Sequence, residues 1–160
     1  MLTMAALLCS CGSRPARWEY RYAPGKTAIV VNGKAVPPAG LPKQVMQIIE
    51  AGNQIAGKPY KYGGGHRSFH DSGYDCSGTV SYALRGAGLI SSPATSGGLR
   101  RFGNRGAGRY VTVYAKSGHA FIVVAGLRLD TGYNGENEGP KWSIRSRPIK
   151  GYVARHPPGL

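Results

Sequence analysis

Acidic residues are scarce in this chain. Its 160 residues include 7 Asp plus Glu against 21 Lys plus Arg, which gives a formal net charge of +14. A field of this sign concentrates polyanions at the surface, so we expect an anionic partner. The basic residues do not cluster into an arm or a helical face, and no helix-turn-helix, zinc-finger or single-strand-binding motif is legible, so we expect no nucleic-acid partner. A polymer rich in phosphate and carboxylate groups accounts for the charge equally well.

Long apolar runs are also missing. Residues 1–8 are largely apolar but stand at the short limit for a signal-peptide core, and no Lys or Arg precedes them. Residues 8–12 read Leu-Cys-Ser-Cys-Gly, which resembles a bacterial lipoprotein processing site. The motif predicts a signal or lipoprotein-like segment over residues 1–12, a lipid on Cys11 and an exported, membrane-anchored chain in the cell envelope. The alternative is a frayed apolar N-terminus with incidental cysteines.

Cysteine is nearly absent from the rest of the chain. Of the 3 Cys, only Cys76 lies beyond residue 12, which excludes a disulfide within the domain. An exported protein that keeps one unpaired thiol carries an oxidation liability. A lone Cys is often only a buried apolar side chain, so the neighbouring residues must decide its role.

The length suits one compact domain. Residues 13–40 are predicted to form an N-terminal extension with a hairpin, because Asn32-Gly33 separates two short apolar runs. Residues 41–160 then form the main domain. It begins with a helix, since Val45, Ile48 and Ile49 start an apolar pattern of three- and four-residue spacing.

The second half of the chain changes period. Residues 110–114, 119–124 and 127–129 read as strands of an antiparallel meander, and further strands are predicted around 142–147 and 152–155. Helices early and strands late predict an α+β fold.

Cys76 begins a second predicted helix. The unpaired N–H groups and partial positive charge of a helix N-terminus favour a thiolate. Asp75 is a good N-cap. Ser77 and Gly78 leave the N–H groups of the first turn approachable by a substrate carbonyl, so Ser77 is a candidate for oxyanion or substrate binding.

A nucleophilic Cys also needs a base, and His119 is the best candidate. It is the first residue of an apolar strand, which is a rigid mount, whereas His66 and His70 lie in a loop and His156 lies in a Pro-rich tail. The alternative for His119 is a structural, hydrogen-bonded histidine.

Three segments carry a resemblance to a known family. Residues 57–64 read GKPYKYGG, residues 74–80 read YDCSGTV and residues 117–123 read SGHAFIV. Together they resemble the NlpC family of papain-like cysteine peptidases, which act on bacterial cell walls, over about residues 41–131. The resemblance implies a nucleophile helix packed on an antiparallel sheet, with Cys76 as nucleophile, His119 as base and Tyr60 lining the site and assisting the oxyanion.

The resemblance also implies a third polar residue on the strand after the base. Thr131 stands at the usual spacing. Asp130 takes the place if the Ala125-Gly126 link is one residue shorter than usual, and a carboxylate is the better partner for an imidazolium. We therefore choose Asp130, with an ordinary turn residue as the alternative.

The loop between Gly65 and Tyr74 brings further polar residues near the thiol. His66 and His70 could read a substrate carboxylate, but their spacing matches no recognised metal-ligand set, so we expect no metal and no cofactor. Four arginines crowd the loop before the strands and are interpreted as a solvated rim: Arg100, Arg101, Arg105 and Arg109.

The function that the resemblance implies is hydrolysis of an amide bond in the peptide stems of peptidoglycan. Two alternatives remain open. One is an acyltransferase or amidase with the same fold, and the other is a non-catalytic module that binds the cell wall or a polyanion, because a fold alone does not establish chemistry.

Overall fold

The computed structural model describes residues 16–132 and 138–160. The lipoprotein-like segment and Cys11 therefore lie outside the described residues. In chain order the elements are β1 (Arg17–Trp18), β2 (Ile29–Val31), β3 (Lys34–Val36), α1 (Lys43–Ile55), α2 (Cys76–Gly86), α3 (Ser96–Leu99), β4 (Asn104–Arg105), β5 (Val111–Lys116), β6 (His119–Val124), β7 (Leu127–Asp130), β8 (Lys141–Ser143), β9 (Arg147–Pro148) and β10 (Val153–His156).

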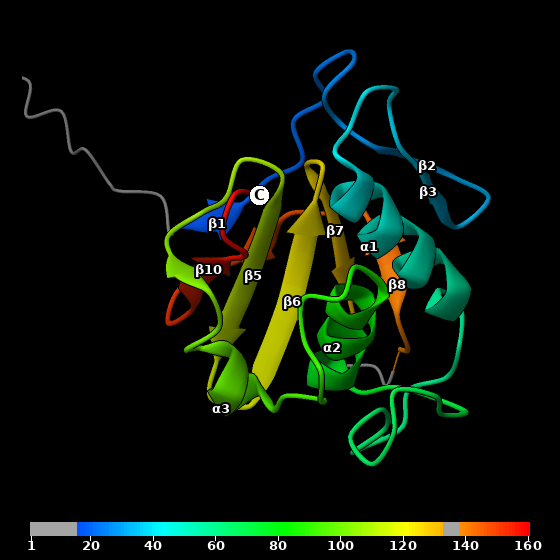
Figure 1. Ribbon diagram of the computed structural model, residues 1–160, viewed down its shortest axis with the longest axis vertical. Coiled ribbons are helices and arrows are strands. Elements are labelled where there is room, and N and C mark those ends of the chain that lie inside the picture. The colour runs from blue at the N-terminus through cyan, green and yellow to red at the C-terminus, as the bar shows by residue number, and fades with distance from the viewer. Residues whose placement is uncertain (1–15, 133–137) are drawn as a thin grey trace, which may run out of the picture.

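The centre of the molecule is a six-stranded antiparallel sheet with strand order β4-β10-β5-β6-β7-β8. Helices α1 and α2 pack together beside it, and α2 lies against β6 and β7 (Figure 1). The fold is therefore α+β, with the helix that begins at Cys76 packed on an antiparallel sheet, as the sequence predicts.

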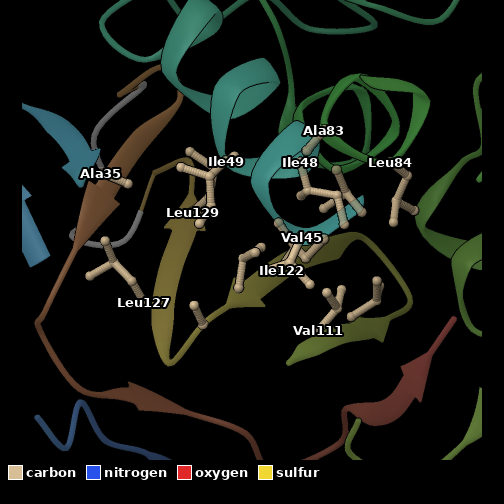
Figure 2. Close-up of a cluster of buried hydrophobic side chains, with 14 of the residues drawn as sticks. Ala35, Val45, Ile48, Ile49, Ala83, Leu84, Val111, Ile122, Leu127 and Leu129 are labelled. Atoms are coloured by element: carbon tan, nitrogen blue, oxygen red, sulfur yellow. The ribbon is translucent and has the colours of Figure 1, made fainter. Parts of the chain in front are cut away.

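The main core fills the space between the helices and the sheet. Ile48 and Ile49 from α1, and Leu84 from α2, meet Ile122 and Leu129 from the strands, and all five are almost fully buried (Figure 2). Burial of each such side chain contributes roughly 1.5–3 kcal/mol. This contact fixes the helix that carries Cys76 relative to the strands that carry His119 and Asp130.

The opposite face of the sheet has a smaller core. Because side chains alternate along a strand, Phe121 and Val123 point away from the face that Ile122 presents to the helices. They pack with Trp18 from the N-terminal segment. Strand β1, which contains Trp18, pairs with β9.

The Asn32-Gly33 hairpin predicted from the sequence is present as β2–β3. Asn32 and Gly33 have φ values of 49° and 77°, as a tight two-residue turn of this hand requires. Asn53 of α1 fastens the hairpin, since its side chain accepts from Ala35 N at 2.8 Å and donates to Ala35 O at 2.9 Å.

Two parts of the sheet differ from the prediction. The expected strand at 142–147 is two short strands, β8 and β9, because β8 continues the sheet beside β7 while β9 pairs with β1. The strand predicted at 152–155 is present as β10, and it lies between β4 and β5, a position that the sequence did not predict. Within the described ranges, no helix has the length and apolar character needed to cross a membrane.

Candidate active site

The thiol lies at the first position of α2. Asp75, the N-cap, has an extended backbone (φ −87°, ψ −174°), and its Oδ1 accepts from Gly78 N at 2.7 Å. This satisfies one of the N–H groups that a helix N-terminus leaves unpaired. Cys76 is partly exposed, and it is the free cysteine of the described residues.

A close backbone approach explains the Gly-rich sequence around the thiol. A Cβ added at Gly78 would lie 2.0 Å from Gly64 O, and Gly65 has a φ of +83°. Glycine is the residue that tolerates both conditions. The Gly-Gly loop thus packs directly on the first turn of α2.

His119 and Asp130 meet across neighbouring strands. The register pairs Ile122 with Leu129, so its continuation sets Phe121 opposite Asp130 and makes His119 a diagonal neighbour of Asp130 on the same face. His119 Nε2 lies 2.8 Å from Asp130 Oδ1. The Asp130 side chain is 3% exposed, and that of His119 is 17% exposed.

The hydrogen bonds distinguish Asp130 from Thr131. Asp130 is the last residue of β7, and Thr131 lies just beyond the strand. Its Oγ1 is buried and has no hydrogen-bond partner among the described residues, while its backbone N donates to Asp130 Oδ1 at 2.8 Å. The residue that contacts the imidazole is Asp130.

Two buried arginines hold the other side of Asp130. Arg128, which is 1% exposed, forms an ion pair with Asp130 Oδ2, and Arg147 Nη1 lies 3.4 Å from the same oxygen. The Arg128 guanidinium also lies 5.5 Å from the ring centre of Trp18, a distance at which a cation and an aromatic face attract. Sequence reasoning missed both arginines, because a charged residue in a strand is expected to face solvent.

The charge around His119 favours its protonated form. Burial by itself lowers the pKa of His119, but hydrogen bonds with Asp130 and Cys76, together with the negative charges of both, outweigh burial and raise the pKa from 6.5 to about 9. Because Nε2 is paired with Asp130, Nδ1 is the ring nitrogen available to the thiol. The imidazole thus lies between Cys76 and Asp130.

Of the four N–H groups in the first turn of α2, two already have acceptors and two are free to bind an oxyanion. Gly78 N donates to Asp75 Oδ1, and Thr79 N donates to Asp75 O at 2.9 Å. Gly78 is therefore not available, contrary to expectation. The N–H groups of Cys76 and Ser77 have no acceptor among the described residues, which leaves them free for a ligand.

The predicted role of Ser77 is thus restricted to its backbone. The residue is 4% exposed, and its hydroxyl lies 3.1 Å from His66 Nε2 and 3.3 Å from Asp75 Oδ1. The hydroxyl is therefore engaged with neighbouring protein groups.

Tyr60 lies beside the thiol and joins Tyr74 in an isolated β-bridge. Burial raises the pKa of Tyr60, and nearby Cys76 and Asp75 raise it further. The phenol therefore stays protonated at neutral pH and keeps a proton to donate.

Tyr152 is a residue of the site that sequence reasoning missed. Its ring meets that of His119 edge-on at 6.3 Å and that of Phe121 at 5.4 Å. Burial raises the pKa of Tyr152, although the hydrogen bond from Arg147 opposes the shift. The only sign of it in the sequence is that an aromatic residue, Tyr152 itself, begins the predicted last strand.

The remaining predicted residues lie apart from the pair of Cys76 and His119 or take other partners. His70 packs edge-on against Tyr82 at 6.0 Å, and His156 Nδ1 lies 3.0 Å from Gly106 O. His66 bonds with Asp75 and Ser77. The loop arginines Arg100, Arg101, Arg105 and Arg109 are exposed. In the described part of the chain, no group of three or more His, Cys, Asp or Glu is arranged to hold a metal ion.

No protein-family model matches this chain, and no curated protein matches it. Among solved structures, it is similar in part to Rv1477, a hypothetical invasion protein of Mycobacterium tuberculosis, with 26% identity and a TM-score of 0.49. The match covers 72% of this chain and 65% of that chain, so this chain spans less than two thirds of that protein. The roles of the site residues therefore depend on the geometry described above.

Proposed function

We propose that this chain is a cysteine hydrolase that cleaves amide bonds in the peptide stems of peptidoglycan. The observation that carries the proposal is the imidazole of His119, which is hydrogen-bonded to Asp130 and lies close enough to Cys76 for the thiol to raise its pKa. A nucleophile, a base and a group that orients the base are the three parts that this chemistry needs.

The mechanism is acyl transfer in two steps. The Cys76 thiolate attacks the carbonyl carbon, and the N–H groups of Cys76 and Ser77, with the Tyr60 hydroxyl, hold the oxyanion. The C–N bond breaks, and the imidazolium of His119 gives its proton to the leaving amine. Neutral His119 then removes a proton from water, which attacks the thioester and releases the carboxylic acid and the thiolate.

The substrate class rests on two features of the sequence. The segments around Tyr60, Cys76 and His119 resemble the NlpC-type cell-wall peptidases, and the charge of +14 suits an anionic polymer. Peptide stems of peptidoglycan combine amide bonds with free carboxylates.

Mass spectrometry of peptidoglycan fragments tests the proposal. Wild type should release a new amine and a new carboxylate from a stem peptide, and Cys76→Ala, shown by circular dichroism to be folded, should release neither. If wild type opens no stem amide, or if Cys76→Ala opens it equally well, the hydrolase proposal is wrong. Competing amines in the reaction separate hydrolysis from acyl transfer, because a transferase would yield a new amide.

The export of the chain is a proposal of its own. A lipid on Cys11 would anchor the protein to a membrane of the cell envelope, with the domain on its periplasmic or extracellular face. Intact-mass measurement after membrane fractionation tests this. Recovery of the unmodified chain from the cytosol, with Met1 in place, would contradict it.

A further inference from the structure

His66 forms a second histidine–carboxylate pair beside the thiol. Its Nε2 lies 3.0 Å from each carboxylate oxygen of Asp75 and 3.1 Å from Ser77 Oγ. The side chains of His66 and Asp75 are 24% and 12% exposed. The imidazole therefore joins the 65–74 loop to the first turn of α2.

Asp75 has two electrostatic effects that oppose each other. As the N-cap, its carboxylate accepts from Gly78 N at 2.7 Å and from Gly63 N at 3.2 Å, and it complements the positive end of the helix. The same negative charge precedes Cys76 directly and disfavours a second negative charge on the thiol. Asp75 and Cys76 both lie close enough to Tyr60 to raise the pKa of its phenol.

We propose that His66 is a positioning residue of the site, one that offsets the charge of Asp75 and thereby permits the Cys76 thiolate. The inference rests on the proposed function for its purpose, but not for its test. As an imidazolium, His66 donates to Asp75 and leaves the pair neutral, so the helix keeps its cap while the thiol is no longer opposed. Ser77 Oγ, which bonds with both members, fixes their relative orientation.

Most other charged or titratable groups around the loop have partners or lie at the thiol itself, and Arg67 is exposed to solvent. Lys61 forms an ion pair with Asp71 at 2.5 Å, and Asp71 Oδ2 also accepts from Gly65 N at 3.1 Å. Tyr74 donates to Phe69 O at 2.8 Å, and Tyr60 lies beside Cys76. The titratable side chain bonded to the Asp75 carboxylate is His66.

The test is the rate at which iodoacetamide alkylates Cys76 in the full chain between pH 5 and 10. Peptide mass spectrometry measures alkylation of Cys76 separately from that of Cys9 and Cys11. His66→Gln, which keeps a donor but removes the charge, should slow alkylation about tenfold near pH 6, because a smaller fraction of the thiol is ionised. The two proteins should converge at high pH, where the thiol is ionised in both. His66→Arg should retain most of the wild-type rate.

Two further variants separate charge compensation from a purely structural role. Asp75→Asn keeps a good N-cap and removes the charge that His66 offsets, so His66→Gln/Asp75→Asn should recover the wild-type rate near pH 6. Asp75→Asn alone should be no slower than wild type, which provides a test even if His66→Gln does not fold. His70→Gln, a change of the other histidine of the same loop, is the matched control and should leave the rate unchanged.

The proposal is wrong if His66→Gln follows the wild-type profile, if His66→Arg is as slow as His66→Gln, or if the double variant is slower than either single one. Because alkylation needs no peptidoglycan, these outcomes are independent of the proposed hydrolase activity. If the alkylation rates change as expected but the protein opens no stem peptide, the proposed role of His66 stands and the proposed hydrolase activity is wrong.

Discussion

His119 Nε2 lies 2.8 Å from Asp130 Oδ1, and the neighbouring Thr131 makes no side-chain hydrogen bond among the described residues. Replacement of Asp130 by Asn should therefore lower kcat/KM by roughly two orders of magnitude, because a neutral amide orients the imidazole but stabilises its cation less. Thr131→Val, which loses no hydrogen bond, should leave kcat/KM unchanged. Steady-state kinetics on a purified muropeptide checks both variants, and a larger loss at Thr131 would move the orienting role to that residue.

Cys76 and His119 should behave as one unit. Cys76→Ala and His119→Ala should each reduce turnover by roughly three orders of magnitude or more, and the double variant should be scarcely worse, because residues that act together are not additive. The same kinetic measurement on all three proteins, each shown to be folded, provides the comparison. Additive losses would mean that the two side chains do not act in the same step.

The stability of the protein should depend on pH through His119. Its folded-state pKa is raised from 6.5 to about 9, so the folded state binds the proton more tightly than the unfolded chain. The resulting stabilisation is complete below pH 6.5 and is lost as the pH rises toward 9. Urea unfolding at several pH values should show the difference between wild type and His119→Gln shrinking over that window. A difference that grows with pH would contradict the raised pKa.

Arg128 should matter for folding more than for chemistry. Arg128→Met removes a buried partner of Asp130 and should lower the free energy of unfolding by roughly 3 kcal/mol, the usual cost of breaking a buried ion pair. Arg101→Met, at an exposed position, is the matched control and should stay within about 0.5 kcal/mol of wild type. Equal effects in urea unfolding would show that the buried pair contributes no more than an exposed arginine.

The contact between Gly64 and Gly78 should not tolerate a methyl group. Gly78→Ala would bring Cβ to 2.0 Å from Gly64 O, and the strain should lower the free energy of unfolding by roughly 1–3 kcal/mol. A Cβ at Gly97 would lie 3.8 Å from the hydroxyl oxygen of Thr95, an ordinary contact, so Gly97→Ala should be neutral or stabilise by up to about 1 kcal/mol. Thermal unfolding of both variants checks the contrast.

Patterns within one segment predicted most of the framework. The spacing of Val45, Ile48 and Ile49 predicts α1, and β5, β6 and β7 lie where apolar alternation predicts strands. The inferences about α1 and these strands succeed because local periodicity decides which face a residue occupies. The choice of Asp130 over Thr131 depended on the length of the Ala125-Gly126 link and on the charge of a carboxylate, and its catalytic role stays a prediction.

Contacts between distant segments were not predictable in this way. Arg128 is buried because Trp18, far away in the sequence, covers it, and no local pattern signals that meeting. Strands β1 and β9, which pair with each other, are two residues long each. Strands this short show no alternation of apolar and polar residues. The pairing of His66 with Asp75 depends on the path of a Gly-rich loop, which residue spacing does not determine.

The thiol belongs to the helical layer and the imidazole to the sheet, and the apolar contacts between Leu84, Ile122 and their neighbours hold the two layers in register. The rate at which Cys76 reacts therefore reports on how closely the helices pack against the sheet. A low concentration of denaturant that loosens the packing between the two layers should lower the alkylation rate of Cys76 while the helical circular dichroism signal is still intact. Alkylation of Cys76 would then slow before the protein unfolds.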